Sequence, residues 1–147
     1  MTDEQGRLSE LRRQSADALD WIANLPDDHR KIPSVCWNIG WHDASNPVDD
    51  RVVLETAQAL SHDLRQIDAP FLEPPVELHG VGGEIIERLV PSPEWLETRL
   101  AVLPAILKRH GLRIQGWAYE PVGCRAFEGW IPQAWCYRET DSNAQTH

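Results

Sequence analysis

The stretch SVCWNIGW, residues 34–41, decides the fold class, because large apolar side chains alternate there with smaller or polar ones. The apolar set, which would share one face of a strand, is Val35, Trp37, Ile39 and Trp41. The other set is Cys36, Asn38 and Gly40, and His42 continues it. A two-residue repeat is the period of a β-strand, whose successive side chains point to opposite faces. The stretch therefore predicts a strand with one buried face.

A helix is expected directly after this strand. Asn46 can cap it, Pro47 suits the first helical position, and Asp49 lies three residues after the cap. Apolar residues then recur at three- and four-residue steps as far as Ile67, which is the spacing of one helix face.

Two further extended segments follow, at residues 71–79 and 84–90. Pro74-Pro75 forbids a helix in the first segment and confines it to the edge of a sheet. The glycine-rich run 80–83 connects the two as a hairpin. A helical turn would also fit the apolar residues of the second segment.

A second helix and a last strand complete the pattern. Ser92 and Pro93 form a strong helix start, and Gly111 provides the stop. Pro104 falls inside this helix and should kink it. Residues 112–119 alternate again and predict a strand.

The order of these elements predicts an α+β domain with the ferredoxin-like split βαβ arrangement, βαββαβ. In it, two helices cover one face of a four-stranded antiparallel sheet, and the core spans residues 34–119. An amphipathic helix at 7–25 precedes the core, and an irregular extension at 120–139 and a disordered tail at 140–147 follow it. A chain of 147 residues fits one domain.

Composition restricts the partners. The net charge is −9, from 14 basic and 23 acidic residues, and no basic run is present. Because nucleic acids are bound mainly through lysine and arginine, they are not expected as ligands. The sequence has no signal peptide and no apolar run of membrane-spanning length, which predicts a cytoplasmic protein without membrane contact. The sequence has three cysteines, Cys36, Cys124 and Cys136. Because their number is odd and their spacing is not that of metal ligands, neither a disulfide framework nor a metal site is expected.

Strand alternation also sorts the side chains of the predicted sheet. The set that should point toward the helices is Val35, Trp37, Ile39, Trp41, Val76, Leu78, Leu112, Ile114 and Ala118. The opposite face would carry the candidate ligand-binding residues, which mix polar and aromatic groups: Asn38, His42, Glu77, His79, Gln115, Trp117 and Tyr119. We expect His42, His79 and Trp117 to share one solvent-accessible concavity. The alternative is that the helix at 7–25 or the C-terminal segment packs across this face.

The sequence is rich in tryptophan, with seven against two phenylalanines and two tyrosines. Tryptophan suits both cores with a polar edge and binding surfaces. Three aromatic residues near the C-terminus, together with Trp117 and Tyr119, would form either an aromatic cage or a satellite core: Trp130, Trp135 and Tyr137.

These features favour a non-enzymatic binding or regulatory domain for a small molecule or a protein partner, with a homodimer as one version. One alternative is a small cofactor-free isomerase or hydrolase with His42 or His79 as general base. Another is an acidic inhibitor or immunity-type protein directed at a basic enzyme. No catalytic motif is present that would assign a cofactor or a catalytic residue.

Overall fold

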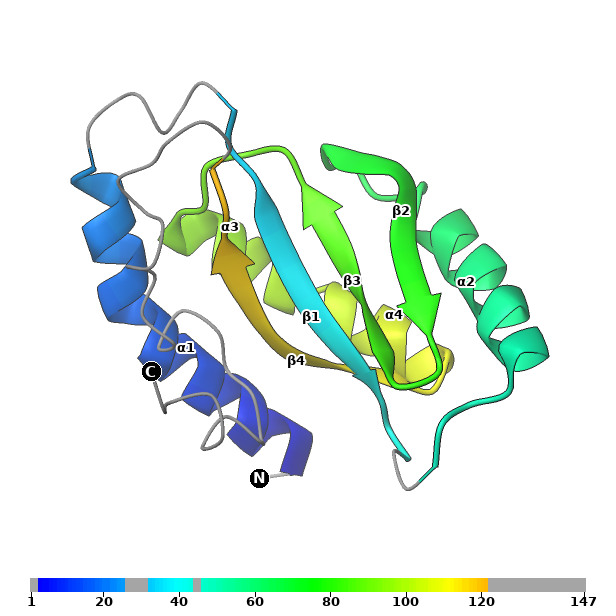
Figure 1. The fold of residues 1–147 in the computed structure, drawn as a ribbon. Coiled ribbons are helices and arrows are strands. Elements are labelled where there is room, and N and C mark those ends of the chain that lie inside the picture. The colour runs from blue at the N-terminus through cyan, green and yellow to red at the C-terminus, as the bar shows by residue number, and fades with distance from the viewer. Residues whose placement is uncertain (1–2, 26–31, 44–45, 122–147) are drawn as a thin grey trace, which may run out of the picture.

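A single antiparallel sheet organises the chain. The computed structural model describes residues 3–25, 32–43 and 46–121, in which four helices and four strands form. The helices are α1 (Asp3–Ala23), α2 (Asp50–Leu64), α3 (Pro93–Leu100) and α4 (Leu103–Arg109). The strands are β1 (Val35–Trp41), β2 (Phe71–His79), β3 (Gly82–Glu87) and β4 (Leu112–Tyr119). Figure 1 shows the strands side by side in the order β2-β3-β1-β4, with every neighbouring pair antiparallel. The predicted α+β class and the four-stranded antiparallel sheet are confirmed.

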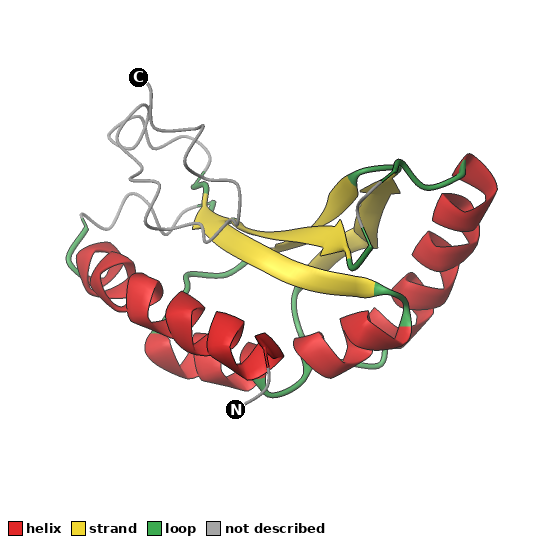
Figure 2. Cartoon of the chain, turned by 90° about the horizontal axis from the view of Figure 1, so that it is seen from below, coloured by secondary structure: helices red, strands yellow, loops and turns green. Residues whose placement is uncertain are grey.

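All four of these helices lie on the same side of the sheet (Figure 2). Two polar contacts fix α1 in this layer beside β4. The indole Nε1 of Trp117 donates to Ser15 Oγ at 2.8 Å, and Arg7 Nη2 donates to the carbonyl oxygen of Ile114 at 2.9 Å. The N-terminal helix therefore belongs to the helix layer and does not cover the opposite face, so the alternative is wrong for this helix. The C-terminal segment, which the alternative also named, lies outside the described residues from position 122 onward.

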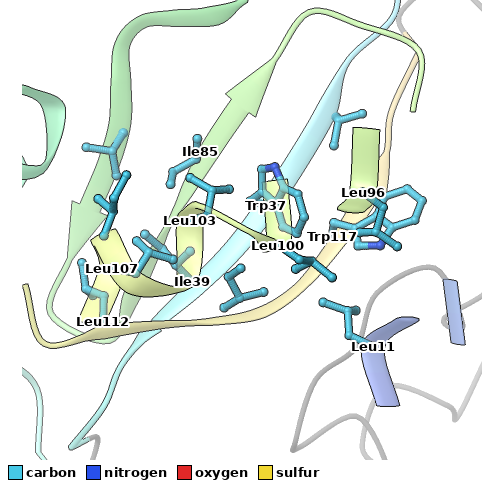
Figure 3. Packing of buried hydrophobic residues seen from close by; sticks show 14 of the residues in the cluster. Leu11, Trp37, Ile39, Ile85, Leu96, Leu100, Leu103, Leu107, Leu112 and Trp117 are labelled. Carbon is cyan, nitrogen blue, oxygen red and sulfur yellow. The ribbon is translucent and has the colours of Figure 1, made fainter. Parts of the chain in front are cut away.

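The core fills the space between the sheet and the helices (Figure 3). Trp37 and Ile85 project from the sheet and are fully buried, as is Leu103 of α4. Leu11 of α1 extends the same cluster beyond β4. Each such side chain contributes about 1.5–3 kcal/mol when it leaves water, so packing between the layers holds the sheet to its helices.

The start of α2 differs from the prediction. Asp49 caps the helix through its side chain, which accepts a hydrogen bond from the backbone N–H of Arg51 at 3.1 Å. Asn46 was expected in that role, and this expectation is wrong. The reason lies outside the helix: the N–H of Val48 donates to Gly80 O at 2.9 Å, which ties the preceding segment to the β2–β3 turn.

The helix predicted after Ser92 is broken in two. The Ser92 hydroxyl accepts from the backbone N–H of Trp95 at 3.1 Å, so the predicted cap is confirmed. α3 ends at Leu100 and α4 begins at Leu103, which places Pro104 in the first turn of α4. Backbone N–H groups in the first turn of a helix have no partner within the helix, so a proline there removes no hydrogen bond. For this reason a new helix begins around Pro104, and no single kinked helix forms.

The hairpin is confirmed, and the helical alternative for its second segment is wrong. β3 pairs with β2 on one side and with β1 on the other. β2 is an edge strand, as its prolines require. The described helices include none that is both long and apolar enough to cross a membrane. The predicted tail at 140–147, nearly all of the extension at 120–139, and Trp130, Trp135 and Tyr137 lie outside the described residues.

Candidate functional site

The sheet surface opposite the helix layer, here called the open face, carries its side chains in rows set by cross-strand pairing. The middle row is polar and runs across all four strands through Glu77, Glu84, Asn38 and Gly116. The next row toward one end is apolar and consists of Ile86, Cys36 and Ala118. The row toward the other end contains His79, Gly82, Gly40 and Arg113.

A β-bulge in β4 changes which residues reach the open face. Asn38 pairs with Gly116, whereas Ile39 pairs with Ile114, so Gln115 is an extra residue on β4. The Gln115 side chain lies over Gly40, where an added Cβ would come 2.3 Å from the amide nitrogen. Gln115 therefore stays on the open face as predicted, and the residues beyond it exchange faces.

Trp117 and Tyr119 correct the prediction. Both are 0% exposed, and the Trp117 indole contacts α1 through Ser15, so they belong to the helix-covered side. Ala118, which was expected to face the helices, lies in the apolar row of the open face. The physical reason is the extra residue at Gln115, because one inserted residue turns every later side chain of a strand to the other face. The expected concavity shared with Trp117 is wrong.

The two candidate histidines, His42 and His79, are both exposed. His79 lies two residues from Glu77 on β2, and His42 follows the end of β1, where its backbone N–H donates to Gly111 O at 2.8 Å. Within residues 3–25, 32–43 and 46–121, no hydrogen bond joins either imidazole to a carboxylate. The same ranges hold no group of three potential metal ligands.

Two carboxylates form the most unusual feature of the open face. Glu77 and Glu84 are directly opposite each other on β2 and β3, and both side chains are exposed. The thiol of Cys36 donates to Glu84 Oε2 at 3.4 Å. Like charges at directly opposed positions of a sheet destabilise the pair by a few tenths of a kcal/mol to about 1 kcal/mol. The isolated chain therefore carries an electrostatic cost that a cation would remove.

A small hollow adjoins this carboxylate pair. Its walls are formed by Leu72, Pro74, Pro75, Glu77, Glu84 and Ile86. Its volume of about 20 Å³ gives room for about one water molecule, and is far below the roughly 300 Å³ of a typical small-molecule pocket. The hollow therefore offers apolar walls beside two carboxylates, and it suits the tip of one side chain more than a whole organic ligand.

Sequence reasoning missed a buried polar cluster on the helix side. Glu87 is 0% exposed and accepts hydrogen bonds from Trp37 Nε1 at 2.9 Å and Trp95 Nε1 at 3.2 Å. Arg99 of α3 binds the same carboxylate with Nε and Nη2, at 2.9 and 2.7 Å to Oε1. The sequence could have predicted this cluster. Glu87 lies two residues from the buried Ile85 and so points to the same face of the sheet, and Arg99 falls within the apolar stripe of its helix. This enclosed cluster has a structural role.

A second missed pair joins α2 to the end of α4. His110 Nε2 and Asp63 Oδ2 are 2.7 Å apart, and both side chains are partly exposed. The hydrogen bond from His110 holds the pKa of Asp63 below its ordinary value, with smaller contributions from Arg109 and His62. An aspartate with a lowered pKa stabilises the fold above its ordinary pKa of about 3.9 and loses this effect as the pH falls through the folded value.

We expect His110→Ala to raise the pKa of Asp63 toward the ordinary aspartate value, because the main hydrogen-bond donor is removed. The matched control is His62→Ala, which removes only the weakest charge contribution and should leave the pKa of Asp63 nearly unchanged. NMR titration of the Asp63 carboxyl carbon in both variants measures the difference. Equal shifts in the two variants would show that the hydrogen bond does not form in solution.

No protein-family model, curated protein or solved structure matches the chain. Its function has to be inferred from its own side chains.

Proposed function

We propose that this chain is a non-enzymatic binding domain whose open face holds a protein partner through a basic side chain placed between Glu77 and Glu84. The observation that carries the proposal is the opposition of these two exposed carboxylates on adjacent strands. Each would gain from a shared cation, and the partner would remove the repulsion present in the free chain.

The dimensions of the face favour a protein over a small molecule. The hollow beside the carboxylates admits only the end of a side chain. Trp117 and Tyr119, the aromatic groups that would have flanked a planar ligand, are buried on the opposite side. The rest of the open face is broad and crosses four strands, which suits a second surface rather than an enclosed ligand.

The apolar lining supports a lysine or an arginine as the recognised group. Pro74 and Pro75 lie next to the carboxylates, and Ile86 closes the same hollow. Basic side chains pack their methylene stems on apolar surface while their charged ends remain at polar groups. The combination of an apolar wall with two acids therefore matches both parts of such a side chain.

An acidic inhibitor of a basic enzyme is a specific form of the same proposal. The carboxylate pair and the net charge of −9 favour it, since an acidic surface speeds encounter with a basic protein. We also infer that the topology is the ferredoxin-like split βαβ arrangement. The interior position of β1 and the placement of β2 and β4 at opposite edges support this inference.

The test is a selection of displayed random peptides on the full-length chain, immobilised at low density. We expect the enriched peptides to contain lysine or arginine and to bind the Glu77→Gln/Glu84→Gln variant at least about tenfold more weakly, which corresponds to about 1.4 kcal/mol. The matched control is Glu55→Gln/Glu94→Gln, which removes two exposed carboxylates from α2 and α3. Peptides that bind both variants and the parent equally would contradict the proposed site.

A further inference from the structure

We propose that residues 122–138 of the chain itself occupy the open face, with the Arg125 side chain between Glu77 and Glu84. This inference rests on the proposed function, because it concerns the same surface and makes the segment a competitor of the basic partner. The segment lies outside the described residues. Its sequence, and the surface beside which it begins, support the proposal.

The described chain leaves the sheet beside the apolar row of the open face. β4 ends at Tyr119, directly after Ala118, which lies in that row with Cys36 and Ile86. Ala118 and Ile86 are partly exposed, and every described helix lies on the other side of the sheet (Figure 2). Residues 122–138 therefore begin next to an apolar surface that none of the described helices covers.

The sequence of residues 122–138 matches both kinds of side chain on the open face. The segment contains two arginines, Arg125 and Arg138, and one acidic residue, in a chain whose net charge is −9. It also contains four aromatic residues, which stabilise a contact when they leave water: Phe127, Trp130, Trp135 and Tyr137. Aromatic side chains fit the apolar row and an arginine fits the carboxylate pair, so one segment supplies a partner for each.

Arg125 lies within reach of the carboxylate pair. The midpoint between Glu77 and Glu84 lies about two and a half strand spacings from β4, or about 12 Å, and two residues along the strands from Ala118, or about 7 Å. The direct distance from Ala118 to this midpoint is therefore about 14 Å. The six residues that follow Tyr119 span up to about 20 Å, which allows Arg125 to lie over the pair.

Arg138 is the less suitable of the two arginines. It lies thirteen residues farther along the chain than Arg125, and the entropy lost on closing a loop grows with the length of the loop. The shorter loop therefore favours Arg125. Arg138 offers a matched control, because it carries the same charge in the same segment.

The tether makes the segment a strong competitor of any separate partner. Linking a ligand to its site gives an effective concentration in about the millimolar range for short linkers. A basic partner binds only when Arg125 has left the carboxylates, so its apparent affinity falls in proportion to the fraction of molecules with a free site. The segment is therefore an internal inhibitor of the binding site.

The experiment records the NMR signals of the side-chain carboxyl carbons of Glu77 and Glu84 in the full-length chain. We expect Arg125→Gln to shift both signals, because it removes the cation that they share, and Arg138→Gln to leave them in place. The shifts should be the same at low and high protein concentration, as a contact within one chain requires. Circular dichroism verifies that both variants are folded.

The same two variants are then compared in binding the basic peptide that the selection enriches most. Arg125→Gln should raise the affinity of the chain for this peptide at least about threefold, which is the gain for a site that is closed in about two thirds of the molecules. Arg138→Gln should leave the affinity unchanged. Equal affinities of the parent and Arg125→Gln would overturn the inhibitory role.

Carboxyl signals that do not move in Arg125→Gln, or that move equally in both variants, overturn the inference. Shifts that grow with protein concentration overturn it as well, because the segment would then bind another copy. In each of these cases, basic peptides that need Glu77 and Glu84 would still support the proposed function. If the signals move as expected but no enriched peptide needs the two carboxylates, the contact within the chain stands and the proposed partner is wrong.

Discussion

Replacing Arg99 with methionine is expected to destabilise the fold by about 3–5 kcal/mol, because Glu87 would retain a buried charge without a cation. The pair is enclosed, with Arg99 8% exposed and Glu87 0% exposed. Urea unfolding followed by tryptophan fluorescence measures the change in the free energy of unfolding. All stability measurements belong at one low protein concentration, so that self-association does not contribute.

Two further variants separate charge burial from loss of packing. Arg12→Met removes an arginine that pairs with Glu97 at 2.9 Å on the surface, and it should cost less than about 1 kcal/mol. Glu87→Gln combined with Arg99→Met removes both charges while leaving an oxygen for the indole N–H groups of Trp37 and Trp95. The double variant should therefore be more stable than Arg99→Met alone. Equal losses in Arg99→Met and Arg12→Met would mean that the Glu87 cluster is open to water.

The second large effect is expected for Trp117→Ala, at about 3–5 kcal/mol, the usual cost of deleting a buried aromatic side chain. Trp117 packs edge-on against Trp95 with ring centroids 5.3 Å apart and bonds Ser15 of α1. Its removal leaves a cavity and deletes one of the two polar contacts that join α1 to β4. The same unfolding measurement gives the loss.

The neighbouring residue supplies the matched control. Ala118→Ser should change the free energy of unfolding by less than about 0.5 kcal/mol, because Ala118 lies on the open face. Without the bulge at Gln115, the two residues would exchange faces. A mild effect of Trp117→Ala would therefore contradict the observed register of β4.

The sequence contained enough local information for most of the elements. Alternation in residues 34–41 and the Ser92 cap predicted β1 and the start of α3 correctly, because strand periodicity and capping depend on neighbours along the chain. The true cap of α2 at Asp49 was missed because the contact between Val48 and Gly80 joins segments distant in sequence.

The β-bulge at Gln115 shows where the local sequence pattern no longer predicts which face of the sheet a side chain points to. Its neighbours on β4 are held by contacts with α1 more than one hundred residues away, from Arg7 to Ile114 and from Trp117 to Ser15. Strict alternation across residues 112–119 therefore assigned Trp117 and Tyr119 to the wrong face. Gly116 carried a usable signal, since an isolated glycine inside a strand pattern suggests a bulge.

The sequence predicted which individual residues lie on the open face, but it did not predict which of them are neighbours across the strands. Asn38 and Glu77 lie in the middle row of the open face, as their parity required, and Gln115 covers Gly40 on the same face. The opposition of Glu77 and Glu84 depends on the register of the β2–β3 hairpin, which the flexible connection leaves undefined in the sequence.

The most direct measurement of the open face as a binding surface is a map of backbone amide NMR shifts. The ¹⁵N-labelled full-length chain is titrated with the basic peptide that the selection enriches most. If the open face binds, the largest changes fall at residues 36–38, Glu77 and Glu84, while Val52 and Leu54 on the exposed side of α2 stay constant. Largest changes along the helices, with Glu77 and Glu84 unmoved, would contradict it.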